Sequence, residues 1–112
     1  MENTISSIEK PLAELLSEWE DLVYKLNRDE IALYQWKEVY NVRADEIIAE
    51  TDFKALYGAN NQKVRDNHVK NELTEWNNII KDLEFTINHT HNRISFLREL
   101  IRVKTVMIGA SE

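Results

Sequence analysis

The feature that most constrains this chain is a ladder of apolar residues in its second half, repeated at alternating steps of four and three residues. It begins at Val69 and continues to Ile108, interrupted by Thr90 and Lys104. This spacing puts all its members on one side of an α-helix and, sustained over several heptads, is typical of a coiled-coil-like seam. We therefore predict a helix over about residues 62–108. The seam residues are Val69, Leu73, Trp76, Ile80, Leu83, Ile87, Ile94, Leu97 and Ile101.

A similar but less regular pattern fills the first half and predicts a helix over about residues 11–49. Only one turn region is expected, at about residues 51–62, because the 112 residues include two glycines and one proline. Within it, Gly58 can adopt the left-handed conformation that ends a helix, and Asn60 or Asn61 can cap the next one. The first-helix pattern consists of Leu12, Leu16, Trp19, Val23, Leu26, Leu33, Tyr40, Ala44 and Ile47, with Leu15, Leu22 and Trp36 on its flank.

The sequence thus predicts an all-α fold, a single domain spanning residues 1–112 in which two long antiparallel helices form a helical hairpin. Each helix carries more apolar surface than one neighbour can cover, which favours a homodimer or higher oligomer and most economically a dimeric four-helix bundle. A parallel dimer through the second helix is the competing arrangement, since isoleucine at a and leucine at d positions favour it.

Polar residues interrupt both apolar patterns. Glu30 and Lys37 fall on the first, and Thr90 falls on the second. Such residues can fix the register of a coiled coil. We predict a polar layer near Glu30, Thr90 and Arg93; the alternative is that the helix rolls and these side chains reach solvent.

Charge is spread unevenly. Residues 1–57 contain six Lys and Arg against thirteen Asp and Glu, a net charge of −7, whereas residues 58–112 contain eight against seven, a net charge of +1. Basic, amide and aromatic residues gather around the turn, where they could contact single-stranded nucleic acid or a protein partner. The alternative is a polar turn whose residues only cap helices. The candidate contact residues are Lys54, Tyr57, Asn61, Lys63, Arg65 and Lys70.

Nothing in the sequence indicates catalysis, and we expect neither an enzyme nor a cofactor. The chain has no cysteine, and His89 and His91 are two residues apart, which directs them away from each other on a helix. We therefore expect no metal site. Neither a signal peptide nor a membrane-spanning run is evident, so a cytoplasmic location without membrane contact is expected.

The run DFKALYGANNQKVRDNHVKNEL, followed by a long heptad helix ending SFLRELIRVK, resembles small helical accessory proteins of phages and prophages of Gram-positive bacteria. The resemblance covers roughly residues 52–106. It implies a non-catalytic oligomeric binding protein, an accessory or inhibitor acting on DNA replication or recombination proteins. Direct binding of single-stranded nucleic acid through the turn, and a structural role as a scaffold or adaptor, remain alternatives.

Overall fold

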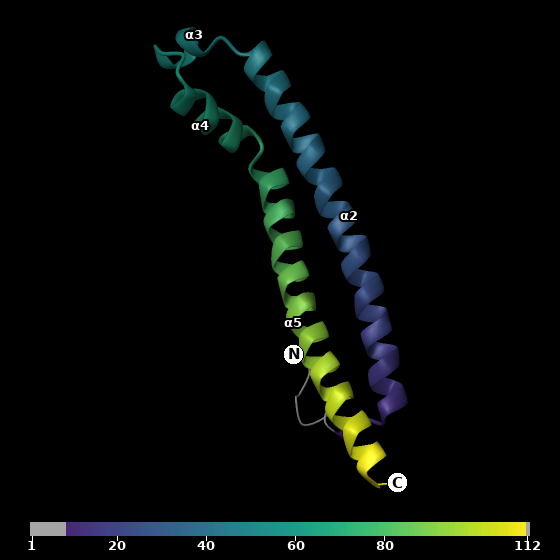
Figure 1. The fold of residues 1–112 in the computed structure, drawn as a ribbon. Helices are drawn as coiled ribbons and strands as arrows, with labels where there is room; N and C mark the ends of the chain where they lie inside the picture. The colour runs from purple at the N-terminus through teal and green to yellow at the C-terminus, as the bar shows by residue number, and fades with distance from the viewer. Residues whose placement is uncertain (1–8, 112) are drawn as a thin grey trace. The chain divides into compact units, whose positions relative to one another are not determined.

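The structure, a computed structural model, describes residues 9–111, with side chains to residue 109. Its main elements are α2 (Leu12–Glu50), α3 (Phe53–Tyr57), α4 (Gln62–Glu72) and α5 (Thr74–Ser111) (Figure 1). No strand occurs among the described residues. The predicted all-α fold and the pairing of two long helices as a hairpin are therefore confirmed.

The chain groups into two compact units. The turn unit is Glu30–Phe85, and the terminal unit combines Met1–Asp29 with Thr86–Glu112. Both long helices contribute a stretch to each unit. The prediction of a single domain stays a prediction.

The core of the turn unit lies where α2 meets α4 and the start of α5. Ile47 packs with Val69 and Leu73, and each of these side chains is at most 7% exposed. Nearby, the rings of Trp36 and Trp76 meet edge to face, with centroids 5.9 Å apart. Trp36 precedes Ile47 in α2, yet its partner Trp76 follows Val69 and Leu73, the partners of Ile47. The two long helices are therefore antiparallel in this unit.

The terminal unit has the same antiparallel order. Leu12 lies beside Ile108, whereas Glu18 bonds to Arg93, so later residues of α2 meet earlier residues of α5. Leu97 is fully buried here. Isoleucine and leucine side chains at four-three spacing thus form the packed side of α5, as the heptad pattern predicts.

The phase of α2 differs from the predicted one near its start. Leu15, assigned to the flank, is 0% exposed, whereas Leu16, assigned to the seam, is 42% exposed. Two adjacent leucines both fit a helical repeat, and a small change in the helix's rotation exchanges their roles. The difference is confined to this pair, since Leu22 of the flank and Trp19, Val23 and Leu26 of the predicted seam are all half-buried.

The predicted unbroken helix over residues 62–108 was wrong at one point. The chain leaves helical geometry at Leu73, where ψ is 27°, and this residue separates α4 from α5. The Thr74 hydroxyl donates to the carbonyls of Lys70 and Asn71, at 3.0 Å each. Such bonding back to the preceding turn competes with the helical ladder and bends helices.

The turn contains a short helix that was not predicted. Asp52 caps α3 by accepting from the Ala55 amide at 3.1 Å. Gly58 ends α3 in the left-handed conformation, with φ 73°, and Asn61 caps α4 by accepting from the Val64 amide at 3.0 Å. The expected roles of Gly58 and Asn61 are therefore confirmed. α2 itself ends near Thr51, whose hydroxyl donates to the Ile47 carbonyl at 2.5 Å.

Candidate partner-binding surfaces

The most unusual surface of the turn unit is the exposed side of α2. Four large apolar side chains there remain about half exposed or more, although they belong to a helix whose other side is packed. Single exposed apolar residues are normal, whereas several on one face of a helix suggest a contact surface. We call this surface the outer face of α2. Its apolar members are Ile31 at 59%, Tyr34 at 67%, Val39 at 49% and Val42 at 57% exposed.

Two shallow grooves adjoin this face. One, of ≈ 150 Å³, is lined by Ala32, Gln35, Trp36 and Val39. The other, of ≈ 300 Å³, is lined by Glu38, Val39, Val42, Arg43, Glu46 and Trp76. Both are open hollows along a helix, a shape that suits the side chains of a partner helix better than an enclosed small molecule.

The sequence carries a signal for this face that was not among the predictions for the first half. A second four-three series, Ile31, Gln35, Glu38 and Val42, runs along α2 out of phase with the buried one. Only two of its four members are apolar, so the series is weaker than the packed pattern. Its meaning becomes visible only when the other side of α2 is seen to be covered.

The predicted oligomer seam lies mostly inside the single chain. Its most buried members, Val69, Leu73, Ile80, Ile87, Ile94 and Leu97, are at most 8% exposed, while Trp76, Leu83 and Ile101 are half-buried. A role of these residues between copies stays a prediction. With so little exposed surface left on the ladder, the outer face of α2 is the better candidate for a second chain.

Several of the candidate contact residues at the turn have local structural roles. The Asn61 side chain is occupied as a helix cap. The Arg65 guanidinium donates to the Asn60 side chain at 2.8 Å and to Gln62 at 3.2 Å. These two residues therefore fit the structural alternative for the turn.

Tyr57 belongs to a ring cluster that fastens α3 to α4. Its hydroxyl lies 2.5 Å from Nδ1 of His68, and the Phe53 ring stacks on Tyr57 at 6.3 Å and meets His68 edge to face at 5.3 Å. Phe53 is 2% exposed and Tyr57 50%. The tyrosine thus keeps one ring face for a ligand while its hydroxyl is engaged.

The lysines of the turn remain exposed. Lys63 and Lys70 are seven residues apart on α4, so they share one side of that helix, with Asn67 between them. Lys54 lies on α3. Asp66 on α4 holds Gln62 at 2.6 Å and adds a negative charge nearby. A small basic stripe therefore exists on α4, diluted by one carboxylate.

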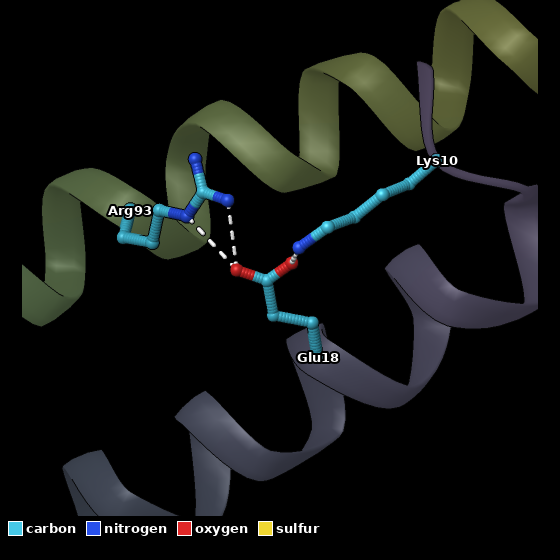
Figure 2. Close-up of polar contacts among 3 residues, drawn as sticks. All are labelled: Lys10, Glu18 and Arg93. Atoms are coloured by element: carbon cyan, nitrogen blue, oxygen red, sulfur yellow. Dashed lines mark hydrogen bonds and ion pairs between the residues drawn. The ribbon is translucent and has the colours of Figure 1, made fainter. Parts of the chain in front are cut away.

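In the terminal unit, Glu18 of α2 joins two cations (Figure 2). One carboxylate oxygen accepts from Nε and Nη2 of Arg93 at 3.1 and 2.7 Å, and the other accepts from the Lys10 ammonium at 3.3 Å. The Arg93 guanidinium also lies over the Phe96 ring at 5.3 Å. Glu18 was not among the predicted site residues, although it stands three residues after Leu15 and four before Leu22, on the packed side.

Of the predicted polar layer, Arg93 is bonded to the Glu18 carboxylate. The side chains of Glu30 and Lys37 are exposed in the turn unit, and the layer itself stays a prediction. Thr90 is 3% exposed and donates its hydroxyl to the Thr86 carbonyl at 2.9 Å, so its polar atom is satisfied within α5. A groove of ≈ 400 Å³ lies beside the cluster, lined by Glu18, Leu22, Lys25, Thr86, His89, Thr90 and Arg93.

Two further kinds of site, a metal site and a membrane span, were also sought in the described residues. Within residues 9–109 there is no group of three or more His, Cys, Asp or Glu placed to hold a metal ion. None of the described helices is long and apolar enough to cross a membrane.

No protein-family model matches the chain, and neither a curated protein nor a solved structure shows significant similarity to it.

Proposed function

We propose that this chain is a non-catalytic helical binding protein that works as an oligomer of hairpins. The observation that carries the proposal is the outer face of α2, where Ile31, Tyr34, Val39 and Val42 stay exposed after the hairpin has formed. These apolar side chains flank the exposed Gln35 and Glu38 on one face of α2, and exposed apolar surface rimmed by polar groups marks sites of protein contact. Burying it against a second hairpin gains roughly 25 cal/mol for each Å² of apolar area covered.

Light scattering coupled to size exclusion tests this proposal. The variant Ile31→Lys/Val42→Lys should lower the molar mass of the protein relative to the unmodified chain, because two charges would have to be buried in the contact. A matched control is Leu56→Lys, which changes a residue of α3 that is 63% exposed. Equal masses for all three proteins would argue against the outer face of α2 as a contact.

We propose that this protein also binds a second protein, a DNA replication or recombination protein of a Gram-positive host. Towards that partner it acts as a phage-type accessory or inhibitor. The support is the sequence resemblance of residues 52–106. The test is affinity purification from such a lysate with the unmodified chain and with Ile31→Lys/Val42→Lys as baits. A replication protein retained only by the unmodified chain is expected, and its equal recovery on both baits would contradict a role for this face.

Direct binding of single-stranded nucleic acid is a second candidate, favoured by the basic stripe of Lys63 and Lys70 on α4. Affinity for a single-stranded oligonucleotide should then fall with salt and with Lys63→Ala/Lys70→Ala. The control is Lys81→Ala, an exposed lysine of α5. Equal affinity for both variants, or no binding at low salt, would exclude the stripe as a binding site.

A scaffold or adaptor role remains a third candidate, and assembly beyond a dimer would favour it.

A further inference from the structure

We propose that two copies of this chain pair through the outer faces of their α2 helices, with those two helices antiparallel. The inference rests on the proposed function, because it specifies the contact through which the hairpins associate. Its basis is the four-three series already seen at Ile31–Val42, which continues in both directions along the continuous helix α2. The full series is Tyr24, Arg28, Ile31, Gln35, Glu38, Val42, Asp45 and Ala49, and every member is exposed.

This series has the spacing of a coiled-coil seam on the side of α2 turned away from its packed residues. Ile47 is buried and Leu33 and Tyr40 are half-buried on the packed side. Successive residues of a helix are rotated by about 100°, which places Ile31 and Val42 roughly opposite Leu33 and Tyr40. A helix with two such seams can contact its own hairpin partner on one side and another chain on the other.

The series is complementary to itself in the antiparallel direction. When two α2 helices cross antiparallel at a point between Trp36 and Lys37, Ile31 of one copy faces Val42 of the other. In the same register Gln35 faces Glu38, and Arg28 faces Asp45. Two-fold symmetry repeats each of these contacts on the other side of the axis. An amide–carboxylate layer, an apolar layer and an ion-pair layer thus follow one another outward from the centre.

The parallel arrangement lacks this match. In register, it would set Arg28 against Arg28, Glu38 against Glu38 and Asp45 against Asp45, and like charges facing each other weaken an interface. Within the described residues Arg28 and Asp45 make no ion pair of their own. By contrast, Arg43 on the flank is occupied by Glu46 at 2.9 Å. The charged ends of the series are therefore available to a second copy.

Disulfide trapping tests the direction directly, because the chain has no cysteine of its own. Oxidation of an equimolar mixture of Ile31→Cys and Val42→Cys should join the two variants, whereas each variant alone should give little covalent dimer. Two copies of residue 31 lie about 16 Å apart in the proposed pairing, at 1.5 Å per residue, beyond the reach of a disulfide. As a control, a mixture of Leu56→Cys and Val42→Cys gives the rate of disulfide formation by random collision.

Rapid crosslinking of Ile31→Cys with itself would overturn the antiparallel pairing, as would a mixture that reacts no faster than the Leu56→Cys control. The unmodified chain should also be measured by sedimentation, because a monomer at every concentration would reject the proposed function together with this pairing. A dimer that fails the crosslinking test would reject the pairing alone.

A charge exchange gives an independent check. Arg28→Asp and Asp45→Arg should each raise the dimer dissociation constant by about tenfold, since each breaks two symmetric pairs. The double variant Arg28→Asp/Asp45→Arg should return it close to that of the unmodified chain. Additive weakening in the double variant would contradict the facing of these two residues. Helix content by circular dichroism confirms that each variant is folded.

Discussion

Arg93 on α5 donates two hydrogen bonds, from Nε and Nη2, to one carboxylate oxygen of Glu18 on α2, a residue that precedes it by 75 positions. Their side chains are 17% and 21% exposed. A charged pair that is largely shielded from water and joins distant parts of the chain fixes the register of the two helices within the terminal unit.

Replacing Glu18 by glutamine should therefore destabilise the protein by about 1–2 kcal/mol, because Arg93 and Lys10 lose the anion they share. Urea unfolding followed by circular dichroism measures the change. The matched control is Glu99→Gln, which removes an exposed carboxylate from Arg102 on the same helix. An equal response from both variants would mean that the Glu18 cluster adds nothing beyond an exposed ion pair.

The adjacent leucines at the start of α2 should respond in opposite ways to truncation. Leu15→Ala should cost about 2–4 kcal/mol, because a fully buried side chain leaves a cavity. Leu16→Ala should cost less than about 1 kcal/mol, because 42% of that side chain is already in water. Denaturant unfolding compares the two, and the reverse ranking would restore the phase predicted from the sequence.

Leu15 and Leu16 mark the limit of what the sequence alone could predict about the fold. The heptad ladder predicted the packed side of α5, because a long repeat leaves one face for it. The left-handed conformation of Gly58 and a cap at Asn60 or Asn61 were predicted, because capping depends on neighbouring residues. The phase of α2 at Leu15, by contrast, depends on which leucine the opposite helix covers.

The site was less predictable than the fold. The ion pair of Glu18 with Arg93 joins residues far apart in the chain, and neither one's local sequence identifies the other. The break at Leu73 arises from the Thr74 hydroxyl, which competes with backbone bonds within a series whose apolar repeat continues undisturbed. The outer face of α2 became recognisable only after the packed face had been assigned.

The two glycines should also differ in their response to alanine. At Gly58, where φ is +73°, a side chain meets no neighbouring atom but strains the backbone, so Gly58→Ala should cost roughly 1–2 kcal/mol. At Gly109, which is helical and equally open, Gly109→Ala should stabilise the protein by up to about 1 kcal/mol. Thermal unfolding of both variants gives the signs; a neutral Gly58→Ala would contradict the left-handed end of α3.

Glu99 offers a pH-dependent test. A hydrogen bond and the positive charge of Arg102 lower the pKa of this carboxyl below its ordinary value. The favourable interaction is therefore present above the ordinary pKa and is lost as pH falls through the lowered one. A carboxyl NMR titration should show the lowered pKa in the unmodified chain and its return in Arg102→Gln. Both groups are exposed, so salt at molar concentration should reduce the difference between the Glu99 pKa values of the two proteins. A pKa difference that salt leaves unchanged would contradict an interaction screened by solvent.

Sedimentation equilibrium of the unmodified chain over a wide range of concentrations tests the central claim most directly, namely that the hairpin leaves apolar surface for a second copy. The account predicts a molar mass that rises with concentration above the 13.3 kDa of one chain. A folded, helical protein that stays at 13.3 kDa throughout would contradict it.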